Sequence, residues 1–275
     1  MNKNNSINEI KEQGYTILDN VLSKDKCEMF KSMLNSDYEQ YGSKYAKSIS
    51  AAHGLNNKEQ EKIVYNLHNK DIKYFEICDN PQIIPIVKEL LQEGSYQDSQ
   101  PFSLLGFDAR NPSSNTEPQQ LHLDSNLPGQ GGFPLMIIAL FMLDEFTKDS
   151  GTTRIVPGSH LRSDYSENGK TYDEEISVEG KQGSVLIFNG AIWHGGGKKS
   201  NDASRWAVIP SYGRWFMKPA FNFTENIPSN IFNQLTNERK ELLGLNTVPP
   251  KDEFTRITRR SAEYEWRNNY QLPTN

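Results

Sequence analysis

Short β-forming runs in the second half of the chain limit its possible folds more than any other feature of the sequence. After Ser103 the runs read SLLGFDAR, QQLHLD, LMIIALFML, TTRIVP, SVLIF and RWAVIPSY, and Gly, Pro, Asn, Asp and Ser separate them. Many short strands joined by turn residues are typical of an all-β barrel or sandwich. The longest apolar run, at 135–143, is far shorter than the roughly 20 residues that cross a bilayer. It predicts a core strand buried on both faces.

The segments on either side of this β core have helical patterns. INEIKEQG, SKDKCEMFKSMLN and QIIPIVKELL precede the core, with a strand predicted at YTILDNVL, and IPSNIFNQLTNERKELLGL follows it as two short helices. We find no internal repeat and no linker-like composition. The 275 residues therefore predict one domain over 1–275, with a mostly helical scaffold at 1–100, the β core at 101–218 and a helical segment at 219–275.

Charge and cysteine content restrict the possible partners and the location. The net charge is -5, and the single basic cluster, TRITRR, is diluted by neighbouring acidic residues, so no nucleic-acid binding is expected. Two cysteines are too few for a disulfide framework, and the N-terminus lacks the apolar run of a signal peptide. These features predict a soluble cytoplasmic protein without a membrane partner. The sequence does not fix the oligomeric state.

The stretch QQLHLDSNLPGQGG contains a potential half of a metal site. Side chains alternate along a strand, so His122 and Asp124 point to the same face. This pair supplies two ligands but cannot complete a site, and an incidental hydrogen-bonded pair is an open alternative. The glycines that follow are not a phosphate-binding loop, because no GK[ST] motif comes after them. They predict a lid loop.

A third ligand and a cation are predicted further along the chain. His194 follows a buried strand at 185–188 and precedes three glycines, which permit close approach of a ligand or of another backbone segment. A turn centred near Lys199 and Ser200 would then place Arg205 on a returning strand opposite His194. This hairpin would put a permanent cation next to the metal.

Two histidines and one carboxylate leave coordination positions open, as in non-haem Fe(II) oxygenases. A guanidinium suits bidentate recognition of a carboxylate, and its charge does not titrate away. Together they indicate a co-substrate that chelates iron at one end and carries a carboxylate at the other. 2-Oxoglutarate has this shape.

The chain resembles the phytanoyl-CoA dioxygenase family of Fe(II)- and 2-oxoglutarate-dependent oxygenases, in GYTILDNVLSKD, LHLD, GTTRIVPGSH, WHGGG and SYGRWF. The resemblance implies a mainly β fold with surrounding helices, a double-stranded β-helix (a cupin-like jelly roll) at 101–218. It also implies that His122, Asp124 and His194 hold iron. Arg205 would bind the distal carboxylate of 2-oxoglutarate, with Gln120 and Thr153 as helpers. No catalytic residue is expected beyond the metal centre.

The expected activity uses Fe(II), 2-oxoglutarate and O2 to hydroxylate an unactivated C–H bond of a small-molecule metabolite, releasing succinate and CO2. Related halogenases replace the carboxylate ligand by a small residue, so Asp124 argues for oxidation without halide. Two alternatives stay open. The same iron site could catalyse desaturation, cyclisation or epimerisation, or the protein could be a non-catalytic metal-binding sensor or binding module holding Zn or Ni.

Candidate substrate contacts lie on segments that, by the resemblance, border the mouth of the site. They are Tyr65, Asn66, Arg110, Arg214 and Phe216. Arg110 or Arg214 would suit an anionic substrate, but the sequence does not identify one. Of the remaining histidines, His160 is interpreted as a hydrogen-bonded turn residue, and His53 and His68 as structural or exposed.

Overall fold

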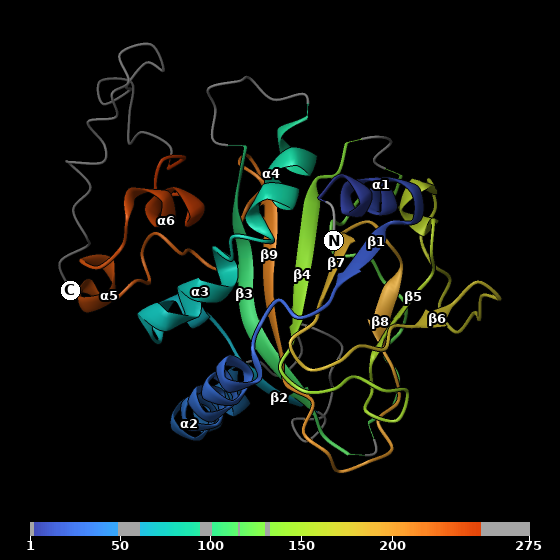
Figure 1. The fold of residues 1–275 in the computed structure, drawn as a ribbon, viewed down its shortest axis with the longest axis horizontal. Helices are drawn as coiled ribbons and strands as arrows, with labels where there is room; N and C mark the ends of the chain where they lie inside the picture. Colours follow the sequence, from blue (N-terminus) through green and yellow to red (C-terminus); the bar gives the residue numbers. More distant parts are fainter. Residues whose placement is uncertain (1–2, 49–60, 94–100, 115, 130–132, 249–275) are drawn as a thin grey trace.

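The computed structural model describes residues 3–48, 61–93, 101–114, 116–129 and 133–248, and within them it contains two antiparallel sheets (Figure 1). The larger sheet has the strand order β1-β7-β4-β9-β3-β2, and the smaller has the order β6-β5-β8. The strands of the larger sheet are β1 Tyr15–Leu18, β7 Val185–Asn189, β4 Met136–Met142, β9 Ala207–Arg214, β3 Phe102–Pro112 and β2 Glu61–Val64. Those of the smaller are β6 Ile176–Ser177, β5 Thr153–Ile155 and β8 His194–Gly196.

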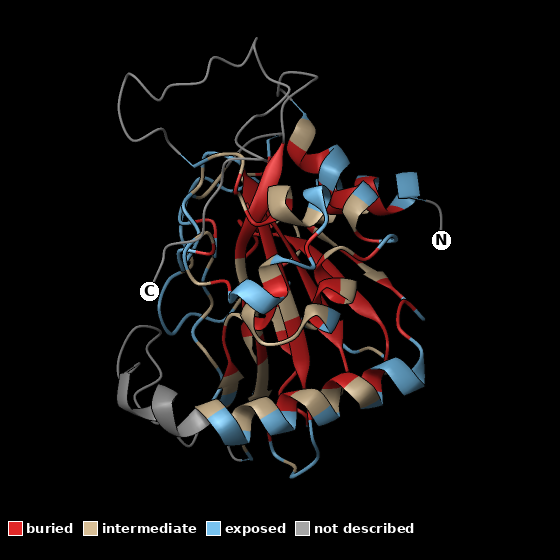
Figure 2. Ribbon diagram, turned by 90° about the vertical axis from the view of Figure 1, so that its left-hand side faces the viewer, coloured by how far each residue is buried: buried red, intermediate tan, exposed pale blue. Residues whose placement is uncertain are grey.

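Helices cover the outer face of the larger sheet (Figure 1). The α-helices are α1 Lys3–Gln13, α2 Lys24–Ser48, α3 Phe75–Cys78, α4 Ile84–Gln92, α5 Ser229–Phe232 and α6 Asn237–Leu242, and the 3-10 turns are Leu67–Asn69, Ile72–Tyr74 and Ser159–Leu161. In Figure 2 the long helix α2 shows an exposed and a buried side, with the buried strands beside it. This is the amphipathic pattern that a helix on a sheet requires.

The two faces of the larger sheet belong to two different hydrophobic clusters. Ala139 and Phe141 of β4 pack with Val208 of β9 and with the helices, whereas Ile138 and Leu140 lie in a second cluster on the inner face. The inner cluster also contains Ile155 of the smaller sheet, so it fills the space between the sheets. Every residue of β4 is buried, which confirms the predicted core strand. Two facing antiparallel sheets with flanking helices make the jelly roll that the resemblance implies.

The predicted hairpin between His194 and Arg205 is wrong. His194 begins β8, which pairs with β5 in the smaller sheet, whereas Arg205 precedes β9, which pairs with β3 and β4 in the larger one. The chain between them crosses from one sheet to the other instead of folding back on itself. Two strands joined by a segment rich in turn residues need not pair when that segment connects two layers.

Two strands of the larger sheet come from the region expected to be a mostly helical scaffold. They are β1, which lies in the strand predicted at YTILDNVL, and β2, and they form the two edges of the sheet. One hydrophobic cluster joins residues as distant as Ile7, Phe107 and Leu243. The prediction of one domain over 1–275 stays a prediction, and residues 249–275 lie outside the described ranges.

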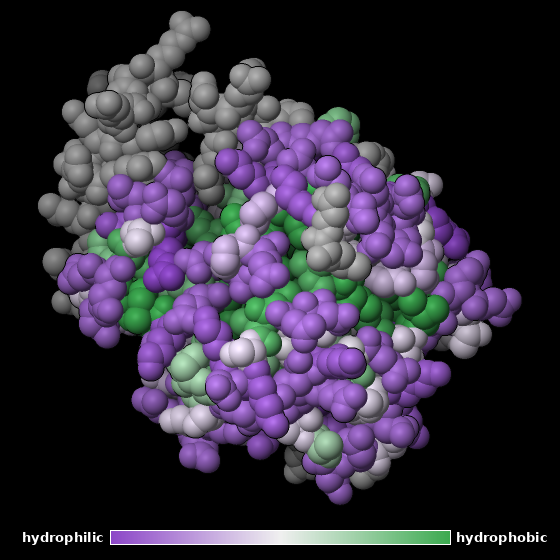
Figure 3. Space-filling model, viewed as in Figure 1, coloured by the Kyte–Doolittle hydropathy of each residue, from purple (hydrophilic) through white to green (hydrophobic). Residues whose placement is uncertain are grey.

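Polar residues cover most of the face seen in Figure 3, with hydrophobic residues visible in a band across its middle. The mean hydropathy of the whole chain is -0.72. Among the helices of the described residues, none combines the length and the apolar character that crossing a bilayer would require.

His68 provides a test of the packing between the helical regions. The ring is fully buried, its Nε2 lies 2.7 Å from Asn226 Oδ1, and burial lowers its pKa to about 4. An unfolded histidine has a pKa near 6.5, so the unfolded state binds more protons between these values. We expect the free energy of unfolding to fall by up to about 3 kcal/mol as the pH drops through this window. In chemical denaturation, the decrease should be smaller for His68→Gln; equal pH dependence would contradict the buried neutral ring.

Candidate functional site

The structure brings His122, Asp124 and His194 together. One potential ligand atom from each lies within 4.8 Å of the others, and they form the one such group of His, Cys, Asp and Glu found among the described residues. Asp124 carboxylate oxygens lie 3.5 Å from His122 Nε2 and 3.4 Å from His194 Nε2. Two imidazole nitrogens and one carboxylate therefore face a common point from one side.

Backbone pairing explains how residues so far apart in the sequence meet. His122 and His194 form an antiparallel bridge in which each backbone N–H donates to the other's carbonyl at 2.9 Å. The backbone N–H of Asp124 donates to the carbonyl of Gly190 at 2.8 Å. The predicted strand at QQLHLD is thus reduced to an isolated bridge, but the pairing still places both histidine side chains on the same side, as opposed residues of a ladder require.

Each histidine ring is oriented by a backbone carbonyl. His122 Nδ1 lies 2.9 Å from the carbonyl oxygen of Gln120, and His194 Nδ1 lies 3.0 Å from that of Ile192. A carbonyl only accepts hydrogen bonds, so Nδ1 carries the proton and the Nε2 lone pair is free for a metal. Such partners fix the tautomer and the ring orientation of metal-binding histidines.

Charge interactions within the triad favour an ionised carboxylate. Burial opposes the charge on Asp124, but the adjacent rings of His194 and His122 outweigh it and hold the pKa of the carboxyl well below its usual range. Burial lowers the pKa of His122, and His194 adds to this effect. Burial also opposes protonation of His194, yet Asp124 outweighs it and raises that pKa. A divalent cation at this point would likewise favour the ionised carboxylate and the neutral imidazoles.

Exposure differs among the three ligands. The side chain of His194 is 9% exposed and packs against Phe188, with the ring centroids 4.9 Å apart, whereas His122 and Asp124 are 44% and 38% exposed. The site is therefore closed on the side of the barrel core and open on the other. Open coordination positions distinguish catalytic metal sites from structural ones.

Gly195 allows the two ligand-bearing segments to approach closely. A Cβ atom there would lie 3.1 Å from the carbonyl oxygen of Gln120, the same oxygen that orients His122. We expect Gly195→Ala to push this carbonyl away and to weaken metal affinity about 10-fold, as for loss of a ligand-orienting group. Calorimetric titration with Ni(II) measures this. Gly106→Ala is the control, because its Cβ would make ordinary 3.8 Å contacts; equal affinities for the two variants would contradict the prediction.

Arg205 lies at the other sheet, with its guanidinium inside the barrel. The residue is 5% exposed, and its Cζ lies 4.0 Å from the ring centroid of Phe146, a member of the inner cluster. Its Nε is buried and has no hydrogen-bond partner among the described residues. Burial lowers the pKa of Arg205 to about 10, so it is still a cation at neutral pH. A buried guanidinium with an unpaired donor is costly unless an anion is bound.

Arg110 connects the two parts of the interior electrostatically. Strand register places it opposite Ile63 of β2 and Ala207 of β9, on the inner face of the sheet. Its guanidinium donates to Asp108 at 2.8 Å and to Glu61 at 3.4 Å. Its charge acts on all three triad residues and on Arg205. Glu61, Asp108 and Arg110, which we call the charged cluster, thus form a charged part of the inner face of the larger sheet.

The two predicted helpers differ in placement. Thr153 is buried in β5 and is two residues before Ile155, which is paired with His194, so Thr153 and His194 share the inner face. Gln120 is exposed, and its Oε1 accepts a hydrogen bond from the backbone N–H of Gly169 at 3.0 Å. The Gln120 side chain is therefore hydrogen-bonded to the loop that contains Gly169, and its backbone carbonyl orients the His122 ring.

The candidate substrate residues are dispersed. Tyr65 is buried and its ring contacts Phe221 edge to face, and Asn66 has a buried side-chain oxygen. Arg214 is buried and donates to the carbonyls of Pro134 and Glu93, both at 2.9 Å. Phe216 is 58% exposed. Of the five, Arg110 alone has a charge that acts on the triad.

The sequence did not predict the residues that contact Arg110 and Arg205 in the interior, namely Glu61, Asp108 and Phe146. Asp108 and Arg110 are two residues apart in the run SLLGFDAR, and two charges on one face of an apolar strand are a signal that could have been used. Glu61 and Phe146 gave no such signal, because their positions depend on which strands pair.

Comparison with known proteins agrees with this geometry. Residues 10–207 match the family model described as Phytanoyl-CoA dioxygenase (PhyH). An uncharacterised protein of Mycobacterium tuberculosis is 22% identical over 247 residues, covering 88% of each chain. The dioxygenase trt7 of Aspergillus terreus is 24% identical over 247 residues, covering 87% of this chain and 82% of its own.

Solved structures share the fold. HygX from Streptomyces hygroscopicus with nickel, 2-oxoglutarate and hygromycin B bound has a TM-score of 0.62 at 15% identity, over 78% of this chain and 88% of its own. Its iron-bound form has a TM-score of 0.60 at 16% identity, over 78% and 87%. The fold is the double-stranded β-helix, and because the family model spans most of the sequence, the chain belongs to the phytanoyl-CoA dioxygenase (PhyH) family.

Proposed function

We propose that this chain is an Fe(II)- and 2-oxoglutarate-dependent dioxygenase that hydroxylates an unactivated C–H bond of a small molecule. In this reaction one atom of O2 enters the product, the other enters succinate, and CO2 leaves. The observation that carries the proposal is an open site with three metal donors in the same barrel as Arg205, a buried cation with an unpaired Nε. A closed tetrahedral site without such a cation would have favoured a structural metal.

The residues present fit both groups. His122, Asp124 and His194 would hold Fe(II) through two Nε2 atoms and a carboxylate oxygen, the ligand set of non-haem iron oxygenases. Bound iron would supply the coupling between O2 and the oxidative decarboxylation of 2-oxoglutarate. Arg205 would bind the distal carboxylate, with Thr153 and Gln120 as helpers. Phe188 and the inner apolar cluster would keep water from the reacting groups.

The charged cluster is the best candidate for substrate contact. Arg110 is already paired with two carboxylates, so Glu61, Asp108 and Arg110 together carry one excess negative charge when ionised. We therefore expect the charged cluster to bind substrates that carry hydroxyl or amino groups better than anionic substrates. Arg110 without its carboxylate partners would have suited an anionic substrate. HygX, whose structure was solved with hygromycin B, is a neighbour in fold that takes a small molecule. Tyr65, Asn66, Arg214 and Phe216 stay candidate contacts.

The test of the function is anaerobic addition of Fe(II) and 2-oxoglutarate to metal-free protein. A weak visible charge-transfer band is expected when the 2-oxo acid chelates iron, followed by succinate formation when O2 is admitted. Protein that binds Zn or Ni tightly but gives neither band nor succinate would favour a metal-binding sensor. Product mass separates the outcomes for a substrate found by screening: hydroxylation adds one oxygen atom, and desaturation removes two hydrogens.

A further inference from the structure

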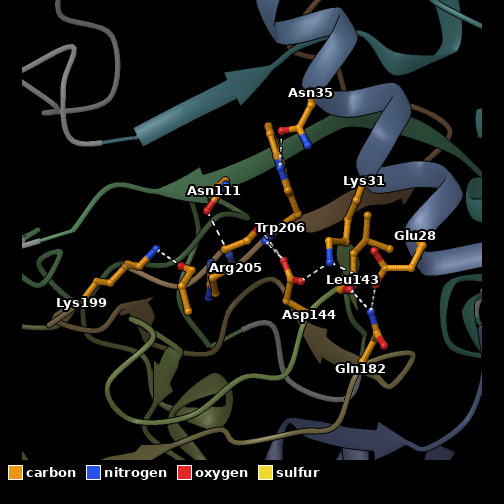
Figure 4. A network of polar contacts seen from close by, with 12 residues as sticks. Glu28, Lys31, Asn35, Asn111, Leu143, Asp144, Gln182, Lys199, Arg205 and Trp206 are labelled. Carbon is orange, nitrogen blue, oxygen red and sulfur yellow. Dashed lines mark hydrogen bonds and ion pairs between the residues drawn. The ribbon is translucent and has the colours of Figure 1, made fainter. Parts of the chain in front are cut away.

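The segment 143–146, directly after β4, contacts Arg205 and the residues on both sides of it. Figure 4 shows Asp144 of this segment between Trp206 and Lys31. Leu143 donates its backbone N–H to the carbonyl of Trp206 at 3.0 Å. Asp144 Oδ2 accepts from the backbone N–H of Trp206 at 2.9 Å and from the hydroxyl of Ser204 at 2.8 Å. Phe146, two residues on, lies against the guanidinium of Arg205.

Helix α2 holds Asp144 from the outer side. Lys31 Nζ lies 2.7 Å from Asp144 Oδ1, and these side chains are 19% and 11% exposed. Burial opposes the charge on Lys31, but Asp144 and Glu28, which both contact its ammonium group, together outweigh burial and raise the lysine pKa. One helical turn later, Asn35 Oδ1 accepts from Trp206 Nε1 at 3.1 Å. The same face of one helix therefore contacts both Asp144 and the strand that follows Arg205.

The backbone of Arg205 itself is fixed from strand β3. Its N–H donates to Asn111 Oδ1 at 3.0 Å. The Ser204 hydroxyl and the backbone N–H groups of Arg205 and Trp206 thus donate to side chains of other segments. With the backbone held in this way, the side-chain torsions of Arg205 set the direction of its guanidinium. Phe146 restricts these torsions by covering one face of the group.

We infer that Asp144, held by Lys31, is a positioning residue that aims the Arg205 guanidinium at the distal carboxylate of the co-substrate. This inference rests on the proposed function. A bidentate guanidinium–carboxylate contact depends on direction as well as distance, so a loosened backbone weakens it even though the cation is retained. The carboxylate of Asp144 contacts neither metal nor co-substrate; it acts through the Ser204–Trp206 backbone.

The experiment measures binding to Ni(II)-loaded protein by calorimetry, with 2-oxoglutarate and with oxalate. Both molecules chelate a metal through two oxygens, but oxalate has no distal carboxylate for Arg205. Asp144→Ala removes the hydrogen bonds to Ser204 and Trp206 and the ion pair with Lys31. It is expected to weaken 2-oxoglutarate binding about 10-fold, with oxalate binding unchanged. Asp144→Asn retains an oxygen for the Trp206 N–H and should recover part of this loss. Lys31→Met should give an intermediate loss.

Lys26→Met is the matched control. Lys26 lies on the same helix and forms an ion pair with Glu76 at 2.9 Å, away from Asp144, so its loss should leave both affinities unchanged. A purely structural role for Asp144 would lower the melting temperature without changing the ratio of the two affinities, and this result would overturn the inference.

Two results separate the inference from the function beneath it. If wild-type protein binds oxalate but not 2-oxoglutarate, the proposed function fails and the inference fails with it. If wild-type protein binds 2-oxoglutarate and the Asp144 and Lys31 variants bind it equally well, only the inference is overturned. The Asn and Met variants keep the test decisive even if Asp144→Ala does not fold.

Discussion

Replacing His194 by alanine is expected to abolish metal binding and to lower turnover at least about 1000-fold, as when the group that holds the reacting centre is removed. His194 is the least exposed of the three ligands, and its Nδ1 is already fixed by the carbonyl of Ile192. Without it, His122 and Asp124 offer one imidazole and one carboxylate on an exposed segment. Two ligands that solvent can reach bind Fe(II) weakly.

The measurement is Ni(II) or Fe(II) titration of the metal-free variant, together with succinate formation. His160→Ala is the matched control. This histidine lies in the 3-10 turn Ser159–Leu161 and is also buried, but its Nε2 lies 3.2 Å from the backbone carbonyl of Lys11 in α1. Its replacement should cost stability and leave metal affinity unchanged. Retention of wild-type metal affinity in His194→Ala would mean that the three residues do not form the metal site.

Replacing Arg205 by methionine is expected to weaken 2-oxoglutarate binding by about 100-fold or more, the usual cost of removing one partner of a buried charge pair. Arg205→Lys should recover only part of the loss, because an ammonium cannot make the bidentate contact of a guanidinium. In the free protein, however, Arg205 buries a charge with an unpaired Nε. We therefore expect Arg205→Met to unfold at a temperature equal to or above that of wild type when both lack metal and co-substrate.

Arg214→Met provides the contrast. Arg214 is buried to a similar degree and its Nη2 is likewise buried without a partner among the described residues, but its Nε and Nη1 donate to two backbone carbonyls, at Pro134 and Glu93. Its loss leaves these acceptors unpaired, so this variant should lose stability while its 2-oxoglutarate affinity is unchanged. If Arg205→Met were the less stable of the two and bound 2-oxoglutarate normally, Arg205 would be a structural residue and the co-substrate assignment would be wrong.

Alternation along the backbone made part of this site predictable. The same-face placement of His122 and Asp124 follows from the two-residue period of an extended segment, and it survives although the segment forms only an isolated bridge. The fully apolar run at 135–143 likewise predicted a strand with both faces covered, which β4 confirms. Both features depend only on residues close in the sequence, because the direction of successive side chains along an extended segment is set by the local backbone.

The sequence by itself thus determined the β-rich core, the flanking helices, the family resemblance and the residues of the potential metal site. Only the tertiary structure decided that β8 and β9 belong to different sheets, that Arg205 is buried against Phe146, and that Glu61 and Asp108 both pair with Arg110. The reason is that strand pairing and the burial of charges are settled by how whole sheets cover their apolar faces. A turn signal cannot report which layer the next strand will join.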